Sequence, residues 1–339
     1  MKTYIFIPPL AKMTGGVAVL FQVARHLVQG GFDACLVLRE ERSRAMVPED
    51  LPTMVWDDLR LTPQDIWLVP EGWVNALTPG LNARARTVVY VQNWAYTFSA
   101  LPEGVSWSQL KVSFLAVSQP VAWFLEQSVG VDCPVLRPGI DLGHFHPAES
   151  ELEGRLSVAY MPRKNKALAS QIRQIFESRR KLQGKEPAAW REIHGLDTHG
   201  VANVLRGSHL FLITGFPEGC PLPPLEAMAS GCLCVGFSGF GGWDYMRQAQ
   251  AGGFVPWWPL RPPEETPWSG NGLWAADADV MAAALALEQA ADWIENMDPR
   301  WKETVAQAQA TVAHYSEERQ KEAVLALWRR AAKHEIFTT

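Results

Sequence analysis

Short runs of apolar, β-favouring residues alternate with segments whose apolar residues recur at helical spacing, and this alternation limits the fold more than any other feature. Apolar residues from 17 to 28 fall on one helical face, and Gly30 and Gly31 end that predicted helix. Strands that are apolar throughout and are separated by helices predict a parallel sheet covered on both faces. Such strands are predicted at 4–7, 34–38, 54–56, 66–69, 87–91 and 114–117.

The same alternation restarts after a charged stretch at residues 149–155, which is the expected domain boundary. A chain of 339 residues is long enough for two α/β domains, each with its own core. Strands are then predicted at 156–161, 192–194, 210–214 and 232–236. Helices are predicted at 167–182, 201–206, 224–230 and 317–333, with an alanine-rich helix reaching about residue 291.

Composition excludes several classes of protein. With 47% hydrophobic and 20% charged residues the chain is not disordered, and a net charge of −5 argues against a general nucleic-acid binder. The apolar run at 4–7 is too short for a secretory signal, and no run approaches a membrane span of about 20 residues. Because the five cysteines show no metal or disulfide spacing, we expect a reduced, cytoplasmic protein.

The most informative segment, residues 215–231, predicts a strand end, an irregular loop and a helix that begins near Pro223 and Pro224. Ligands of open α/β sheets bind at the carboxyl ends of the strands. The start of a helix offers free N–H groups and a positive dipole end, which suit a phosphate. Two carboxylates, Glu218 in the loop and Glu226 in the first turn of the helix, are better suited to accept hydrogen bonds from sugar hydroxyls.

This segment resembles the signature of retaining glycosyltransferases of the GT-B fold, especially family 4, whose pattern is E-G-F-G-L-P-P-L-E-A-M-A-x-G. It departs at Cys220 and Pro221, and the proline lacks the N–H of a usual backbone contact to the donor sugar. The resemblance implies two Rossmann-like domains that face each other across a cleft, with a C-terminal helix crossing back to the first. The first domain would comprise 1–150 with 317–339, and the donor-binding domain would comprise 151–316.

The resemblance also implies roles for the two glutamates. Glu218 would hold the donor sugar near its reacting carbon as a catalytic residue, and Glu226 would bind the ribose hydroxyls. The alternative is two surface glutamates at a helix start. The neighbouring residues expected to contact the donor are Gly219, Cys220, Pro221, Leu222, Pro223 and Leu225.

A basic turn follows the first predicted strand of the second domain. The family places an Arg and, a few residues on, a Lys at this strand end to stabilise the leaving diphosphate. Arg163 matches the arginine, and because the interval is compressed here, Lys164 and Lys166 are both candidates for the lysine. A solvated basic turn is the alternative interpretation.

Three further positions are weaker candidates, and each has a structural alternative. Gly15 and Gly16 match the family's N-terminal Gly-Gly loop near the donor phosphates or the acceptor, although such a pair is often only a turn. Gly241 and Gly242 lie in a glycine-rich loop expected beside the donor, or in a plain turn. Asn93 stands where many members have a histidine, so it offers a polar contact but no acid–base chemistry.

No metal or other cofactor is expected. Asp277 and Asp279 form the D-x-D pattern with which another glycosyltransferase fold binds a metal ion, but they directly precede the alanine-rich helix. Aspartate is favoured at the cap and first turn of a helix, so we interpret both as helix-start residues. The resemblance implies that the leaving diphosphate itself helps take the acceptor's proton on the same face.

The expected function is metal-independent, retaining transfer of a sugar from a nucleoside-diphosphate sugar to a hydroxyl of a glycan, lipid-linked or small-molecule acceptor. No nucleic-acid partner is expected. The sequence leaves open the base, the sugar, the oligomeric state and peripheral association with the inner face of the membrane. Two alternatives remain, a GT-B nucleotide-sugar epimerase and a non-catalytic carbohydrate-binding relative.

Overall fold

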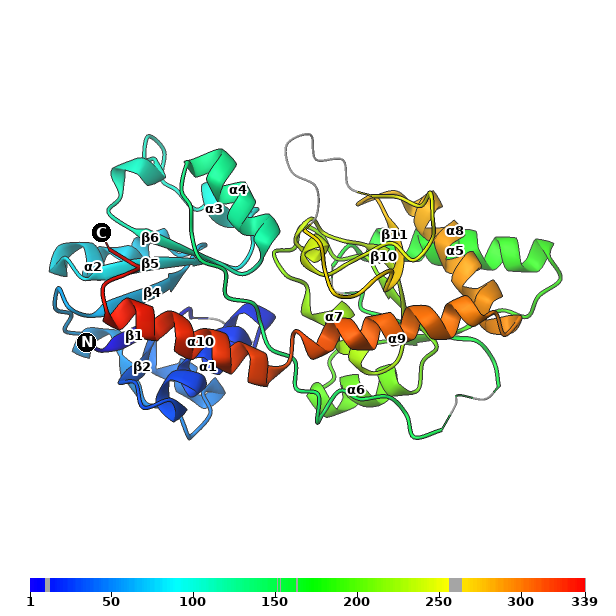
Figure 1. The fold of residues 1–339 in the computed structure, drawn as a ribbon, viewed down its shortest axis with the longest axis horizontal. Helices are drawn as coiled ribbons and strands as arrows, with labels where there is room; N and C mark the ends of the chain where they lie inside the picture. The colour runs from blue at the N-terminus through cyan, green and yellow to red at the C-terminus, as the bar shows by residue number, and fades with distance from the viewer. Residues whose placement is uncertain (10–12, 151, 153, 163, 256–263, 339) are drawn as a thin grey trace. The chain divides into compact units, whose positions relative to one another are not determined.

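The computed structural model describes residues 1–9, 13–150, 152, 154–162, 164–255 and 264–338. The chain divides into two compact units, the first formed by Met1–Gly139 with Glu317–Thr339 and the second by Ile140–Ser316. Each unit is built on one parallel sheet with helices packed against it (Figure 1). The expected α/β class with two parallel-sheet units is therefore confirmed.

Unit 1, comprising Met1–Gly139 and Glu317–Thr339, has a six-stranded sheet of order β3-β2-β1-β4-β5-β6 in which every pairing is parallel. Its central strands are fully buried, as their continuous apolar character predicts. The strands are β1 (Thr3–Ile7), β2 (Ala34–Leu38), β3 (Thr53–Val55), β4 (Ile66–Pro70), β5 (Arg86–Val91) and β6 (Ser113–Ala116). The α-helices are α1 (Gly15–Gln29), α2 (Thr78–Ala83), α3 (Tyr96–Ser99), α4 (Gln119–Val129) and α10 (Glu317–Ala332).

The C-terminal helix α10 belongs to unit 1, as the resemblance implied. It lies beside α1 (Figure 1). The fully buried Trp328 donates from Nε1 to Thr3 Oγ1 at 2.9 Å, and Gln22 of α1 donates to Glu317 Oε1 at 3.0 Å. These contacts join the last helix to the first strand and the first helix.

Unit 2, comprising Ile140–Ser316, has a five-stranded parallel sheet of order β11-β10-β9-β7-β8. The strands are β7 (Ser157–Tyr160), β8 (Ala189–Glu192), β9 (Leu210–Ile213), β10 (Leu233–Phe237) and β11 (Gly272–Ala275). The α-helices are α5 (Lys166–Leu182), α6 (Thr198–Arg206), α7 (Leu222–Ala229), α8 (Val280–Glu295) and α9 (Pro299–Ala313).

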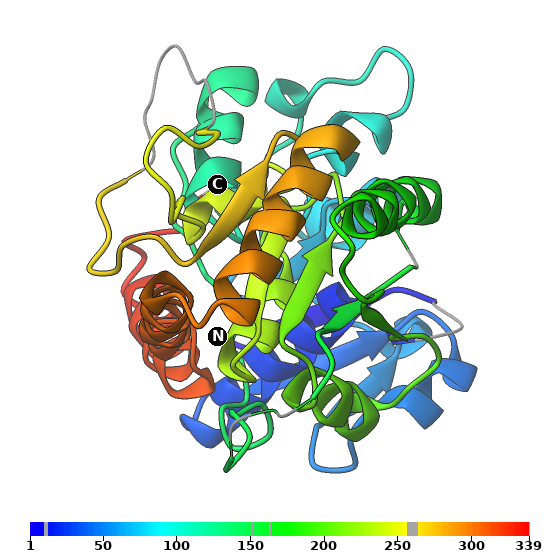
Figure 2. The same ribbon diagram turned by 90° about the vertical axis from the view of Figure 1, so that its right-hand side faces the viewer.

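Helices cover this sheet in two layers. Helix α8 packs on β9, β10 and β11 and pairs with α5, and Figure 2 shows it in orange along the strands. Helices α7 and α9 pack together and also contact β10. One core joins Val158 and Val235 of the strands to Phe176 of α5 and Leu287 of α8, all of which are solvent-inaccessible.

Two sequence-based placements are wrong in detail. The units divide after Gly139, before the charged stretch, because Ile140 donates its N–H to Tyr315 O at 2.7 Å and already pairs with the end of unit 2. The strand expected at 192–194 is β8, which spans Ala189–Glu192 and pairs with β7. Ile193 follows the strand and still donates its N–H to Tyr160 O at 2.9 Å. No helix in the described part of the chain is long and apolar enough to cross a membrane.

Candidate functional site

The carboxyl ends of four neighbouring strands meet at one edge of the sheet in unit 2. Lys164 follows β7, Glu218 follows β9, Gly239 follows β10 and Asp277 follows β11. Parallel strands deliver their following loops to the same edge, which is where open α/β sheets bind ligands. The fold thus brings together residues that are far apart in the sequence.

An ion pair joins two of the predicted site residues. Lys164 Nζ donates to Glu218 Oε1 at 2.6 Å, and the two side chains are 37% and 19% exposed. Both charges therefore remain accessible to a ligand. Lys166, the other lysine candidate, begins α5 and is exposed, while the predicted Arg163 lies outside the described residues.

Asn165 connects the basic turn to the signature loop, a role that the sequence analysis missed. Its backbone is left-handed, with φ at +56°, which asparagine tolerates better than most residues. Its Nδ2 donates to Thr214 O at 2.8 Å and to Phe216 O at 3.2 Å. An asparagine between two lysines at a strand–helix junction was the available signal.

The glycine-rich loop after β10 pairs with the signature loop through its backbone. Glu218 N donates to Gly239 O at 2.9 Å, and Gly241 N donates to Glu218 O at 3.0 Å. A Cβ at Gly241 would lie 1.9 Å from Gly219 O, so a side chain cannot fit there. Packing within the chain therefore explains why residue 241 is a glycine. Gly242 beside it is also buried. Their contact with a donor stays a prediction.

Helix α7 begins earlier than expected, and this changes its suitability for a phosphate. The helix starts at Leu222, and Pro221 is its N-cap residue. The helix can start this early because Pro223, its second residue, lies in the first turn, where proline is tolerated. Glu226 therefore lies in the second turn rather than the first. Since Pro223 and Pro224 carry no N–H, Leu222 is the only one of the first three helical residues that can donate. Charge on Lys164 thus matters more for a phosphate than the helix start does.

Glu226 is a desolvated carboxylic acid that keeps part of its surface accessible. Burial raises its pKa from the ordinary 4.5 to about 7. Within the described residues, no side chain or backbone N–H donates to this carboxyl group to offset that cost. Titratable groups with such shifts mark candidate binding sites.

Glu226 should contribute measurably to nucleotide binding. Charge-assisted hydrogen bonds are worth about 1.5–3 kcal/mol, so Glu226→Ala should weaken the binding of a nucleoside diphosphate roughly ten-fold or more. Only the ionised carboxylate accepts from both ribose hydroxyls, so affinity should rise as the pH passes about 7, by roughly ten-fold between about pH 6 and about pH 8.

Titration calorimetry at several pH values measures both effects. Glu226→Gln is the control, since it cannot ionise and its pH profile contains only the ionisation of the ligand's phosphates. Equal affinity of the folded Glu226→Ala variant and the wild type, or parallel pH profiles of Glu226→Gln and the wild type, would contradict the assignment.

A second cluster lies at the carboxyl edge of the sheet in unit 1. The buried Glu71, directly after β4, accepts the backbone N–H groups of Gln92 and Asn93, each at 2.9 Å. Gln92 in turn donates from Nε2 to Gly16 O at 3.1 Å. A Cβ at Gly16 would lie 2.4 Å from Gln92 Oε1, so the predicted Gly15–Gly16 start of α1 allows this close approach.

Glu71 is a second acid that the sequence analysis missed. Burial raises its pKa to about 7, while the backbone N–H groups of Gln92, Glu71 itself and Asn93 pull the pKa down. The pKa of Glu71 in the folded state lies above the ordinary 4.5, so the protonated acid stabilises the fold. Its contribution to the free energy of unfolding is complete below about pH 4.5 and is lost as the pH rises through about 7. Both carboxyl oxygens hold the turn that carries Asn93, which assigns Glu71 to positioning that turn.

The comparisons with known proteins agree with this architecture. The sequence matches no family profile. A stretch of 234 residues, 67% of this chain, is 28% identical to an α-1,6-glucosyltransferase of Actinobacillus pleuropneumoniae serotype 7 (strain AP76), of which it covers 70%.

Solved structures extend the similarity over nearly the whole chain. A glycosyltransferase from Rickettsia africae has a TM-score of 0.69 at 14% identity, with 98% of this chain and 99% of that chain covered. The sucrose-phosphate synthase of Thermosynechococcus elongatus has a TM-score of 0.65 at 14% identity, with 97% and 99% covered. The chain therefore has the GT-B type of fold, and the sequence match supports the expected class of enzyme, a glycosyltransferase.

Proposed function

We propose that this protein is a retaining glycosyltransferase that moves a sugar from a nucleoside-diphosphate sugar to an acceptor hydroxyl. The observation that carries the proposal is the Lys164–Glu218 pair at the carboxyl edge of the sheet in unit 2, followed along the same signature segment by Glu226. A cation, a sugar-facing carboxylate and a desolvated carboxylate supply three different contacts that a nucleotide sugar needs. The sequence similarity to a glucosyltransferase supports the same class.

The proposed roles in unit 2 follow from charge and accessibility. Lys164, with Lys166 nearby in the sequence, stabilises the negative charge that grows on the departing diphosphate. Glu218 accepts hydrogen bonds from hydroxyls of the donor sugar, and Glu226 accepts from the ribose. The leaving diphosphate takes the proton of the acceptor on the face from which it departs, so no protein base is required.

Unit 1 is the proposed acceptor side. Gly15 and Gly16 open α1, and the turn held by Glu71 at the same sheet edge carries Asn93, a buried side chain whose Oδ1 accepts the N–H of Ala95 at 3.1 Å. The acceptor is proposed to be a hydroxyl of a glycan, a lipid-linked glycan or a small molecule. The similar glucosyltransferase is named for an α-linked product, and retention with an α-linked nucleotide donor yields such a linkage.

An epimerase is a weaker candidate on structural grounds. It needs acid–base groups that reach the sugar ring. Glu71 has a suitable pKa of about 7, but it is only 5% exposed and both of its carboxyl oxygens accept backbone N–H groups. A non-catalytic relative needs neither Lys164 nor Glu218, and here both are present and paired. We further propose a cytoplasmic location, with association at the inner membrane face as the arrangement for a lipid-linked acceptor.

A thermal-shift screen followed by a transfer assay tests the proposal. A ligand that binds only the native state at about 100 times its Kd stabilises by about 2.7 kcal/mol, so the matching nucleoside diphosphate should raise Tm clearly. The matching nucleotide sugar should then give an α-linked product with a panel of glycan acceptors. Transfer should keep its rate after exhaustive EDTA treatment, since lysine charge serves the diphosphate.

Three results would count against different parts of the proposal. No shift with any nucleoside diphosphate would contradict donor binding. Conversion of a nucleotide sugar to its epimer without an acceptor would establish the alternative activity. Loss of transfer in EDTA, restored by manganese, would overturn the metal-independent mechanism.

A further inference from the structure

The two aspartates of the D-x-D pattern have different roles in the structure. Asp279 is the N-cap of α8 and accepts the N–H of Ala282 at 2.9 Å, as the helix-start interpretation predicts. Asp277 does not cap the helix. Its Oδ1 accepts the N–H of Gly239 at 2.9 Å, so it reaches from the end of β11 to the loop after β10. The helix-start interpretation is therefore correct for Asp279 and wrong for Asp277.

The backbone that Asp277 holds is the backbone that pairs with Glu218. Gly239 donates its N–H to Asp277 and accepts the N–H of Glu218 with its carbonyl at 2.9 Å. Two residues on, Gly241 donates to Glu218 O at 3.0 Å. Glu218 thus has both of its backbone polar groups fixed by the same short loop. Asp277 holds the same loop by accepting the N–H of Gly239.

The electrostatic interaction between Asp277 and Glu218 also indicates that their carboxylates lie in one site. Desolvation raises the pKa of Asp277, the N–H groups of Gly239 and Ser238 lower it, and the negative charge of Glu218 adds a smaller upward shift. The residue as a whole is exposed, so its carboxyl group lies at the accessible edge with its inner oxygen turned to the loop. Placing a second negative charge near Glu218 is unfavourable unless the backbone N–H groups offset it.

We propose that Asp277 is a positioning residue that holds the Gly239 loop and, through it, sets the place of Glu218 for the donor sugar. The inference rests on the proposed function, because it assigns a purpose to the exact placement of Glu218 in sugar transfer. Asp277 acts through backbone groups and makes no contact with the reacting atoms. Displacement of a catalytic group by about 1 Å is enough to slow a reaction as much as 100-fold.

Two measurements on matched variants test this proposal. Hydrogen–deuterium exchange of the free protein reports on residues 238–241 and needs no ligand. Asp277→Ala should increase amide exchange there, and should lower kcat about ten-fold or more with the donor identified by the thermal-shift screen. Its Kd for the nucleoside diphosphate should stay within about two-fold, because Glu226 and Lys164 are unchanged.

Asp279, the second aspartate of the D-x-D pattern, provides a matched control. Asp279→Ala removes one carboxylate two residues away, and should increase exchange at the start of α8 and lower Tm while kcat stays at the wild-type value. Asp277→Asn keeps an oxygen that can accept from Gly239, and should recover most of the rate and the protection.

Each contrary outcome has a distinct meaning. Unchanged exchange at 238–241 in Asp277→Ala would show that Asp277 does not hold the loop. Faster exchange with an unchanged kcat would show that the loop does not position Glu218, and equal losses in Asp277→Ala and Asp279→Ala would indicate a general loss of stability. Any of these overturns the proposal. If the wild type transfers no sugar, the proposed function fails together with the catalytic purpose of Asp277, whereas the exchange measurement still decides the contact.

Discussion

Replacing Glu218 with alanine should reduce the turnover of sugar transfer about 100-fold or more. Glu218 is the partner of Lys164 and lies where the ends of β7, β9 and β10 meet. Removing one preorganised polar group from a site where charge develops typically costs 10²–10³ in rate. The variant also leaves Lys164 without the carboxylate that orients it. Steady-state kinetics at saturating donor measures the loss.

Two further variants separate the causes of this loss. Glu218→Gln keeps the shape and the backbone pairing with Gly239, so a loss similar to that of alanine would assign the effect to charge. Glu303→Ala, an exposed glutamate on α9, controls for the removal of a surface carboxylate and should leave kcat unchanged. A Glu218→Ala protein with wild-type turnover would remove Glu218 from the catalytic site.

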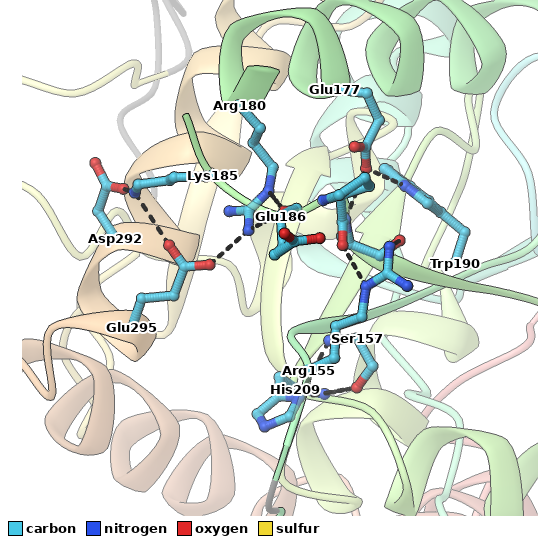
Figure 3. A network of polar contacts seen from close by, with 12 residues as sticks. Arg155, Ser157, Glu177, Arg180, Lys185, Glu186, Trp190, His209, Asp292 and Glu295 are labelled. Atoms are coloured by element: carbon cyan, nitrogen blue, oxygen red, sulfur yellow. Dashed lines mark hydrogen bonds and ion pairs between the residues drawn. The ribbon is translucent and has the colours of Figure 1, made fainter. Parts of the chain in front are cut away.

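Replacing Arg180 with alanine should destabilise unit 2 by about 1.5–3 kcal/mol, the usual contribution of hydrogen bonds made by a charged group. Figure 3 shows its guanidinium between α5 and α8, and the side chain is only 4% exposed. It donates to Glu186 O at 2.8 and 2.6 Å and to Glu295 Oε1 at 2.7 Å. Without it, the Glu186 carbonyl loses its side-chain donor and Glu295 keeps only its ion pair with Lys185. For a unit of this size, the melting temperature should fall by roughly 5 °C.

The preceding residue is a matched control for this substitution. Arg179 also pairs with a glutamate of α8, Glu288, but its side chain is 38% exposed. Glu288 keeps a second donor, Gln183 Nε2, so Arg179→Ala should shift the melting temperature far less. Calorimetry of both variants makes the comparison. Similar shifts for Arg179→Ala and Arg180→Ala would show that burial of the arginine does not determine how much its contacts contribute to stability.

Periodicity alone predicts most of this fold, because buried parallel strands and amphipathic helices leave strong local patterns. The strand at 34–38 and the helix at 317–333 were placed nearly to the residue. Two elements of unit 2 were missed. Strand β11 has four residues after a segment rich in tryptophan and proline, and α9 begins with Pro299 and mixes alanine with polar residues. Neither has a pattern that stands out from a loop.

The candidate site is predictable only where the information is local. Glu218 and Glu226 belong to one motif, and that motif alone singles them out. The roles of Asp277 and Glu71 depend on pairings across 38 and about 20 residues, and the link between Lys164 and Glu218 spans 54. No spacing rule covers such separations, since they are set by the order of strands in each sheet.

The order in which the chain leaves the ribosome has a consequence for unit 1. Unit 2 is one continuous stretch, so all of its strands and helices are available before α10 is made. Unit 1 begins first and finishes last, because Trp328 must still arrive to cover Thr3 and the neighbouring helix α1. During that interval the flank of α1 that carries Gln22 and His26 lacks its partners on α10, Glu317 and Gln320. The first part of unit 1 thus stays open to chaperones and proteases until α10 has been made.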